Sequence, residues 1–529
     1  MDQVGESEAV VTLDDASPPR GNPFPVVGIG ASAGGLEAFG QLLGAVPADT
    51  GMAFVLVQHL DPGHESLLAE LLSPLTQMPV VTVRDGIRLE PNKVYVIPPN
   101  TSMVMEDSHL RLAQREAGLH PPIDIFFRSL AAVQGGRAIG VVLSGNASDG
   151  SLGLRAIKAG CGLTFAQDEF TARFNGMPRS AAATGAVDFV LPPADIGREL
   201  AQLGSHPYLL PARPGEAESE TLPEGESDFK RLFILLKAAT TVDFSHYKPT
   251  TVRRRIGRRM MVLRIETLSE YARYAQQQPT ELQELYRDLL ISVTSFFRDP
   301  EAFESLSKHV SDMLTQDSQR REPIRLWVPG CATGEEVYSL AMCLNELLSK
   351  LELAVPIQLF GTDVSELALE RARRGLYSEV ISEDVSPARL RRFFTKADSG
   401  YQIVKLIRES CVFARHDVTK DPPFSRIDVV SCRNLLIYLD AVAQRHVLPV
   451  FHYALKPTGL LVLGSAETTG AVSDLFTPVD KRHNIYSRNP ASLRPGLKFS
   501  VGPHFVDDAR SRVRPPDRAE WICRSVWSG

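Results

Sequence analysis

The sequence predicts an α/β protein with two doubly wound parallel-sheet domains and a small all-helical region between them. Two stretches, residues 24–204 and 324–488, alternate short β-branched runs with helical patterns. Such alternation is typical of βαβ units whose parallel sheet is covered on both faces. Residues 229–320 between them show helical periodicity throughout. A chain of 529 residues is also too long for one ordinary core.

The composition excludes several classes of protein. A net charge of −6 gives no global indication of a nucleic-acid or membrane partner. Six cysteines without C-x-x-C spacing argue against a zinc ribbon and a secreted disulfide framework, and we expect no metal site. The acidic amino terminus does not resemble a signal peptide. Since no apolar run reaches the roughly 18 residues of a membrane span, we expect a cytoplasmic protein.

Composition and periodicity also predict where the domains begin and end. An acidic tail without periodicity is expected to be disordered, a segment rich in Pro, Glu, Ser and Gly is expected to be a linker, and the C-terminal segment is rich in Arg and Pro. The predicted parts are a tail at 1–22, a first sheet domain at 23–204, a linker at 205–228, a helical region at 229–320, a second sheet domain at 321–488 and a tail at 489–529.

The stretch "VVGIGASAGGLEAF", residues 26–39, has the form of strand, glycine turn and helix and admits two interpretations. Its glycines loosely match a loop that binds a dinucleotide pyrophosphate, whereas Gly30–Gly34 match G-x-S-x-G, an elbow that presents a serine. A dinucleotide site requires a carboxylate at the end of the second strand. The second strand, "AFVLVQHL", carries His59 there instead, although Asp61 keeps the dinucleotide interpretation open.

The elbow interpretation needs a histidine and a carboxylate near the serine. Ser32 ends the first strand, His59 ends the second, and Asp149 lies in the loop after the central strand "AIGVVLSG". Because the carboxyl ends of parallel strands converge, we expect these three residues to form a catalytic triad. The simpler alternatives are a turn serine and a turn aspartate. His64 is a rival base by composition, but it lies beyond the strand end and is interpreted as solvated or helix-capping.

Four stretches, "GIGASAGGLEAF", "VQHLDPGHES", "VVLSGNASDGSLGLRAIKAGCGLTFAQDE" and "GMPRSAAATGAVDFVLPP", resemble the catalytic domain of the chemotaxis receptor methylesterase family, CheB. The resemblance implies that Ser32 is the nucleophile, His59 the general base and then acid, and Asp149 its orienter. The implied substrate is a glutamyl methyl ester on a receptor helix, cleaved through an acyl-enzyme. Ala33 and Asn146 depart from the family's threonine and methionine, and we expect no receiver domain.

A second loop, "RLWVPGCATGEEVYSLAM", repeats the form of strand, glycine turn and helix. The strand that follows, "PIQLFGTD", ends in Asp363, which is placed to bind ribose hydroxyls. The loop lacks a P-loop lysine, so an adenosine ligand without a pyrophosphate fits, and S-adenosylmethionine is such a ligand. Glu335 is placed to bind its amino group, and Asp417 its adenine. A packing loop with a solvated aspartate is the simpler alternative.

The stretches "VTSFFRDPEAF", "WVPGCATGEEVYS", "FGTDVSELALERARRGLYS", "FARHDVTKDPPFSRIDVVSCRNLLIYLD" and "LKPTGLLVLGSAETT" resemble the chemotaxis receptor methyltransferase family, CheR. The resemblance covers about 229–488 and implies methyl transfer from S-adenosylmethionine to a receptor glutamate. It implies cofactor contacts at seven residues: Thr294, Arg298, Glu335, Asp363, Asp417, Arg433 and Asn434. It further implies that Arg298 and Tyr438 orient the substrate.

The segment "TTVRRRIGRRMMVL" predicts a helix with Val252, Ile256, Met260 and Leu263 on one face. Its arginines are typical of a solvated face or a nucleic-acid patch. Because no aromatic residues are interleaved for base stacking, we prefer a docking surface for the methyl-accepting helices of a receptor. The residues of this surface are Arg253, Arg254, Arg255, Arg258 and Arg259. A further segment, "RRFFTKADSGYQIVKLIRES", predicts a hairpin.

The leading hypothesis is a cytoplasmic, bifunctional enzyme of chemotaxis that methylates receptor glutamates and hydrolyses the resulting esters, with glutamine deamidation as a further activity. One alternative is a signalling scaffold in which one or both catalytic centres are idle. Another is a small-molecule esterase fused to a general methyltransferase. No nucleic-acid partner and no membrane insertion are expected.

Overall fold

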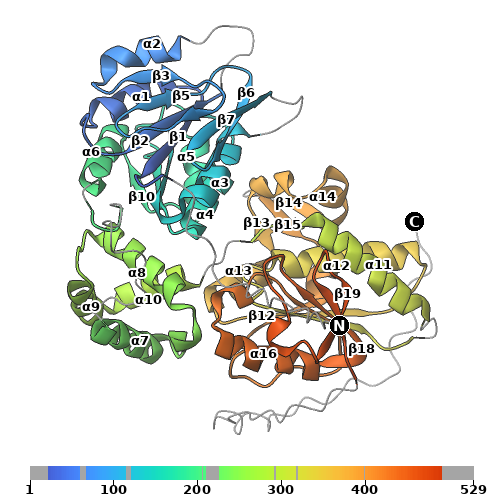
Figure 1. Ribbon diagram of the computed structural model, residues 1–529. Coiled ribbons are helices and arrows are strands. Elements are labelled where there is room, and N and C mark those ends of the chain that lie inside the picture. The colour runs from blue at the N-terminus through green and yellow to red at the C-terminus, as the bar shows by residue number, and fades with distance from the viewer. Residues whose placement is uncertain are drawn as a thin grey trace, which may run out of the picture.

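The described part of the computed structural model contains a first sheet domain, a group of helices and a second sheet domain (Figure 1). It comprises residues 22–59, 67–114, 121–204, 206–209, 226–290, 294–316, 320–397 and 400–490. Asp61 and His64, and most of the expected tails and linker, lie outside the described residues.

The first sheet has seven strands in the order β10-β9-β8-β1-β2-β5-β3, and all of its pairs are parallel. All six residues of the central strand β1 are buried, as expected where helices cover both faces. The strands are β1 Val26–Ala31, β2 Ala53–Gln58, β3 Val80–Thr82, β5 Val94–Val96, β8 Ala138–Val142, β9 Leu163–Gln167 and β10 Phe189–Leu191.

Helices cover both faces of this sheet, which confirms the doubly wound prediction. Helices α1 and α6 pack on one face and α3 and α4 on the other, over separate apolar clusters. The helices are α1 Gly35–Gly44, α2 Leu68–Leu72, α3 Pro122–Gln134, α4 Ser151–Ala159, α5 Gly176–Ala183 and α6 Pro193–Leu203. A small antiparallel sheet, which was not predicted, contains β4 Ile87–Arg88, β6 Thr101–Glu106 and β7 His109–Gln114.

The middle of the chain is helical, as predicted. Val252 and Ile256 of α8 are buried in the core of this helical region, with Met260 and Leu263 at its edge, so the expected apolar face of α8 is confirmed. The helices are α7 Glu226–Thr240, α8 Pro249–Leu263, α9 Leu268–Gln277 and α10 Pro279–Leu289. In the part of the chain that is described, no helix has the length and apolarity needed to cross a bilayer.

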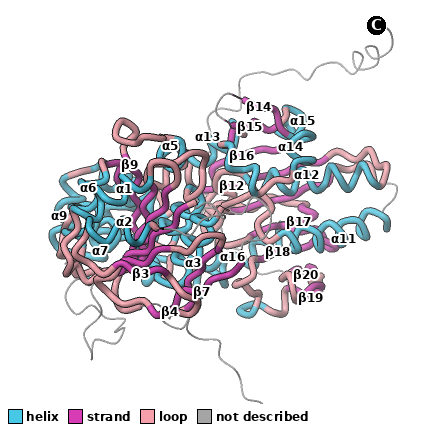
Figure 2. The backbone as a smooth tube through the Cα atoms, turned by 90° about the horizontal axis from the view of Figure 1, so that it is seen from above, coloured by secondary structure: helices cyan, strands magenta, loops and turns pink. Residues whose placement is uncertain are grey.

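The second sheet has the order β16-β12-β11-β17-β18-β20-β19 and is parallel except at the β20-β19 edge. Figure 2 shows the labelled strands β16, β12, β17 and β18 in this order across the sheet, and β11 lies between β12 and β17. Strand β20 is antiparallel to both β18 and β19, and the other pairs of this sheet are parallel as predicted. The strands are β11 Ile324–Pro329, β12 Ile357–Asp363, β16 Cys411–Arg415, β17 Ile427–Cys432, β18 Leu455–Leu463, β19 Phe476–Asp480 and β20 Ile485–Arg488.

A three-stranded antiparallel sheet is inserted beside the second sheet and contains the predicted hairpin as β14 and β15. Its strands are β13 Leu376–Tyr377, β14 Phe394–Ala397 and β15 Gly400–Ile403. Helix α11, which was expected in the helical region, packs against α12 in the core of the second sheet domain. The helices here are α11 Pro300–Gln316, α12 Glu335–Lys350, α13 Glu366–Arg374, α14 Pro387–Phe393, α15 Lys405–Glu409 and α16 Ala441–Ala454.

A buried arginine of α8 joins the helical region to the first sheet domain. Arg258 is 0% exposed, and its guanidinium donates to the carboxylates of Asp188 and Asp288. Its Nε also donates to the Gly162 carbonyl oxygen at 3.1 Å. Burial alone would raise the pKa of Asp188, but the charges of Arg258 and Lys158 hold that pKa below its ordinary value. The buried Arg258 guanidinium is therefore paired with a carboxylate of the first sheet domain and with one of the helical region.

Neighbouring residues of α8 extend this contact. Arg255 donates to the carbonyl oxygens of Lys158 and Ala159, at 2.9 and 2.5 Å, where α4 ends. The hydroxyl of Tyr208 donates to a carbonyl of the same helix, and its ring lies against Gly257. A Cβ at Gly257 would lie 2.2 Å from that ring, so only glycine permits this approach. The contact is therefore a closely packed interface.

These contacts correct the predicted receptor-docking surface of Arg253, Arg254, Arg255, Arg258 and Arg259. Arg255 and Arg258 are buried against the first sheet domain, where no partner protein can reach them. Arg259 pairs with Glu281 inside the helical region. Helix α8 carries the predicted arginines, but Arg255, Arg258 and Arg259 contact other residues of the same chain.

Replacing Arg258 tests this interface. Arg258→Met leaves two buried carboxylates with less compensation, and we expect a loss of about 3 kcal/mol in the free energy of unfolding. Differential scanning calorimetry should show a lower melting temperature and the separation of one domain's transition from the rest. The exposed Arg254→Met is the control, with an expected change within about 0.5 kcal/mol. Wild-type melting of Arg258→Met would contradict the interpretation.

Candidate active sites

Ser32, His59 and Asp149 come together at the carboxyl edge of the first sheet, after β1, β2 and β8. The Nδ1 atom of His59 lies 3.2 Å from the Ser32 hydroxyl, and its Nε2 atom lies 2.7 Å from an Asp149 carboxylate oxygen. If the ring proton is on Nε2 and bonds Asp149, the Nδ1 lone pair faces the hydroxyl. This arrangement suits a general base that activates a serine.

The Asp149 carboxylate is held by the start of α3. Its two oxygens accept hydrogen bonds from the backbone N–H groups of Ile123 and Asp124, at 3.1 and 2.9 Å. A helix amino terminus favours a negative charge at this position. Asp124 itself is buried, and burial together with the charge of Asp149 raises its pKa well above the ordinary value. Sequence reasoning missed this support, although the helix-opening "PPID" was its signal.

The turn at Ser32 differs from a strained elbow. Its left-handed residue is Gly34, with φ of 77°, and Ser32 is not among the described residues with positive φ. Gly145 lets the loop after β8 approach the serine, because a Cβ there would lie 2.9 Å from the Ser32 Cβ. The backbone N–H of Ser32 donates to the Ser144 carbonyl at 2.9 Å. The serine is therefore positioned by neighbouring loops and not by a strained backbone.

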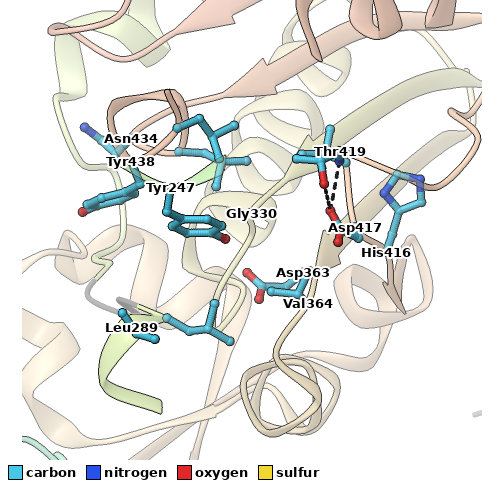
Figure 3. Close-up of a pocket in the computed structure, with 14 residues that line it drawn as sticks. Tyr247, Leu289, Gly330, Asp363, Val364, His416, Asp417, Thr419, Asn434 and Tyr438 are labelled. Atoms are coloured by element: carbon cyan, nitrogen blue, oxygen red, sulfur yellow. Dashed lines mark hydrogen bonds between the residues drawn. The ribbon is translucent and has the colours of Figure 1, made fainter. Parts of the chain in front are cut away.

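A cavity lies at the carboxyl edge of the second sheet (Figure 3). Four of the residues predicted to contact cofactor or substrate line it: Asp363, Asp417, Asn434 and Tyr438. Among the described residues that line this cavity there is no lysine or arginine. Two carboxylates without cationic side chains suit the hydroxyl and amino groups of an adenosine, and they do not suit a polyphosphate.

The Asp363 carboxylate is fixed at the end of β12. It accepts hydrogen bonds from the backbone N–H groups of Ala332 and Ser365, at 2.9 and 2.8 Å. Burial raises the pKa of Asp363, and these N–H donors oppose that rise. In Figure 3 the carboxylate points toward the ring of Tyr247. Asp363 is thus oriented before any ligand arrives.

Hydrogen bonds within the protein also hold Asp417 and Asn434 in position. The Asp417 carboxylate accepts from the N–H and the hydroxyl of Thr419, at 3.0 and 2.6 Å. Asn434 has a positive φ of 59°, and its N–H donates to the Glu467 carboxylate at 2.9 Å. Sequence reasoning missed Glu467, which is buried and also bonds Gly464. It shapes the loop that brings Asn434 to the cavity.

The remaining predicted cofactor residues do not line this cavity: Thr294, Arg298, Glu335 and Arg433. Arg433 is buried and donates to the Arg298 carbonyl and the Asp299 carboxylate, both at 2.7 Å. It therefore holds the turn that carries the exposed Arg298. Glu335 is buried at the start of α12, where it accepts from the Thr333 hydroxyl at 2.6 Å.

Comparison with known families assigns a family to each part of the chain. Residues 27–200 match the CheB methylesterase family, residues 227–290 match the all-alpha domain of CheR methyltransferase, and residues 292–485 match its S-adenosylmethionine-binding domain. The chain belongs to the CheR methyltransferase family, and its first sheet domain matches the CheB methylesterase model. It joins a CheB methylesterase domain to the two domains of a CheR methyltransferase.

Individual relatives agree with this assignment. The chain is 30% identical to chemotaxis protein methyltransferase 2 of Vibrio cholerae, over 47% of this chain and 88% of the relative. It is 40% identical to protein-glutamate methylesterase/protein-glutamine glutaminase 2 of Burkholderia lata, over 38% of this chain and 61% of the relative. An uncharacterized 104.1 kDa protein of Rhodobacter capsulatus is 41% identical over 81% of this chain, which spans about half of that relative, 46%.

Tyr247 of the all-alpha CheR domain was missed by sequence reasoning, yet it lines the cavity of the other CheR domain. Its ring packs on Phe244, 4.9 Å between centroids. The next residue, Lys248, donates its N–H to the Tyr438 carbonyl at 2.9 Å. Burial and the charges of Asp417 and Asp363 raise the pKa of Tyr247. The helical domain thus contributes an aromatic wall to the cavity at Asp363.

Tyr247 offers a direct test of this wall. We expect Tyr247→Ala to weaken S-adenosylmethionine binding about ten-fold, because a stacking aromatic contributes roughly 1–3 kcal/mol. Tyr247→Phe should bind nearly as well as the wild type. Isothermal titration calorimetry provides the measurement, with the half-exposed Tyr453→Ala as the control. An unchanged Kd for Tyr247→Ala would show that the ring does not contact the cofactor.

Proposed function

We infer that this protein both methylates receptor glutamates with S-adenosylmethionine and hydrolyses the resulting methyl esters. The observation that carries this proposal is the Ser32-His59-Asp149 hydrogen-bond chain, which shares one polypeptide with the carboxylate-lined cavity at Asp363. Neither arrangement is needed in an idle scaffold. Both belong to domains whose families perform opposite reactions.

In the esterase reaction Ser32 attacks the carbonyl carbon of a glutamyl methyl ester. His59 takes the serine proton at Nδ1 and then delivers it to the departing methanol. Water, activated by the same nitrogen, hydrolyses the acyl-enzyme and regenerates Ser32. Asp149 keeps the imidazole oriented and stabilises its protonated form. The same sequence applied to a glutamine amide would release ammonia, which accounts for deamidation.

In the methyltransferase half, the Asp363 carboxylate would accept hydrogen bonds from the ribose hydroxyls. The Asp417 carboxylate would accept a hydrogen bond from the adenine amino group, and Asn434 would lie beside the ligand. The cofactor supplies an electrophilic methyl group when it is bound. Arg298 and Tyr438 would orient the acceptor carboxylate toward that methyl group. No covalent nucleophile is required, because positioning in a closed site can supply most of the acceleration.

The receptor would reach the methyltransferase through its acidic methylation helices. Of the predicted arginine surface, Arg254 is exposed and Arg253 is half-exposed, beside the Phe229 ring. Arg254 is therefore the arginine of α8 that we assign to contact with an acidic partner. Electrostatic attraction at such an exposed residue would accelerate encounter more than it would strengthen binding.

The proposal is tested with receptor membranes and methyl-labelled S-adenosylmethionine. We expect the wild type to label the receptor and release methanol, and Asp363→Ala to lose labelling because the ribose contact is removed. Ser32→Ala should retain more label and release methanol at least about 10³-fold more slowly, because the nucleophile is absent.

Ser473→Ala and Asp474→Ala are matched controls, since both residues are exposed and distant in sequence from the two sites. They should behave as the wild type does. A wild type that neither labels receptor nor releases methanol would favour the scaffold hypothesis. Turnover of small esters or small acceptors in the absence of any receptor activity would favour the small-molecule hypothesis.

A further inference from the structure

Helix α4 runs from one candidate active site toward the other. Its first residue, Ser151, follows Asp149 of the triad by two positions, and its end is held by Arg255 of the all-alpha CheR domain. Figure 1 shows α3 and α4 at the end of the methylesterase domain that faces the methyltransferase. One residue of this helix, Arg155, extends into the CheR half.

Arg155 holds the segment that carries Arg298. Its Nη2 atom donates to the Thr294 carbonyl oxygen at 2.8 Å. The same segment is anchored on its other side by Phe296 and Phe297, which are buried in the CheR core, and the Phe297 N–H donates to the Ser339 hydroxyl at 3.0 Å. The methylesterase domain therefore supplies one anchor of this segment, in addition to these contacts and to the bond from Arg433.

Arg155 also acts on Glu335, the residue expected to bind the amino group of S-adenosylmethionine. Burial raises the pKa of Glu335, and the positive charge of Arg155 is the strongest influence opposing that rise, ahead of the Thr333 hydrogen bond. Arg128 of α3 and, to a lesser extent, the same guanidinium oppose the burial-driven rise in the pKa of Asp384. Other titratable groups in electrostatic contact with Glu335 include Cys331, Tyr338, Tyr377 and Asp384.

None of these other groups can replace the charge of Arg155. Cys331, Tyr338 and Tyr377 have raised pKa values and stay neutral near pH 7, and Asp384 is a like charge. A carboxylate must be ionised to bind the cofactor's ammonium group strongly. The cation that favours this ionised form comes from the methylesterase domain.

The domain interface keeps Arg155 in place. Arg255 bonds the carbonyls at the end of α4, and the buried Arg258 bonds the Gly162 carbonyl just beyond it. A side-chain carbon on Gly185 of the methylesterase domain would lie 3.8 Å from the Arg371 guanidinium of α13. Arg155 thus enters the CheR half from a surface that is fixed on several sides.

We propose that Arg155 of the CheB domain is a positioning residue of the CheR methyltransferase site, which anchors the Thr294 segment and presents its positive charge to Glu335. The inference rests on the proposed function, because it takes Glu335 as the residue that binds the amino group of S-adenosylmethionine. The methyltransferase is therefore incomplete without the methylesterase domain of the same chain.

The test uses the full chain and S-adenosylmethionine, titrated by calorimetry at pH 6, 7 and 8. We expect Arg155→Ala to raise the Kd about five-fold at pH 8 and by a larger factor at pH 6. The sign follows from Glu335: without the cation its pKa rises, so more of it is protonated as the pH falls. A merely structural loss would change the Kd by the same factor at every pH.

Two further variants separate the anchor from the charge. Arg155→Lys keeps the charge and should restore most of the binding at pH 6, whereas Arg155→Gln keeps a donor for Thr294 without the charge and should retain the pH-dependent defect. The exposed Arg84→Ala of the same domain is the control. Unchanged methanol release from a methylated receptor would show that Arg155→Ala is folded.

The outcomes are distinguishable. If the wild type binds S-adenosylmethionine and Arg155→Ala binds it within two-fold at all three pH values, the role of Arg155 is overturned and the proposed function stands. The role of Arg155 would also be overturned if Arg155→Ala and Arg155→Lys weakened S-adenosylmethionine binding by the same factor at all three pH values. If the wild type does not bind S-adenosylmethionine, the proposed function fails and this inference fails with it.

Discussion

The buried guanidinium of Arg258 is the constraint on which the arrangement of this protein depends. A charge without solvent is costly unless its partners are charged and well placed, and here the partners, Asp188 and Asp288, come from two different bodies of the chain. Separating those bodies would leave buried carboxylates without their cation. Met261 of the same helix packs into the core of the first sheet domain, which adds an apolar contact. The two enzymes therefore form one structural unit.

This constraint gives α4 its position between the two sites. The loop before α4 supplies Asp149 to the triad, and its side chain Arg155 bonds the Thr294 segment of the methyltransferase. The two halves nevertheless use different chemistry. The methylesterase needs a nucleophile whose base is held by a buried carboxylate, whereas the methyltransferase needs a cavity whose carboxylates are oriented beforehand by backbone N–H groups, as at Asp363.

The arginine-rich helix shows why a charge pattern does not identify its partner. A solvated face, a docking surface and an internal interface all place arginines at helical spacing opposite an apolar face. What distinguishes them is whether acceptors lie opposite, and for Arg255 and Arg258 the acceptors are carbonyls and carboxylates of the chain itself. Arg254 stays exposed, and the docking role predicted for all five arginines is proposed only where the helix faces solvent.

The amino-acid pattern was enough to predict the two sheets, the helical region and the convergence of Ser32, His59 and Asp149, because the carboxyl ends of parallel strands meet at one edge of a sheet. It also located Asp363 and its glycine loop from local spacing. Three features appeared only in the folded protein: Gly34 and not Ser32 takes the left-handed turn, Tyr247 lines the cavity at Asp363, and Arg155 bonds the Thr294 carbonyl of the CheR half. Spacing along a chain encodes local geometry, whereas these contacts join residues far apart in sequence and exist only once the domains have docked.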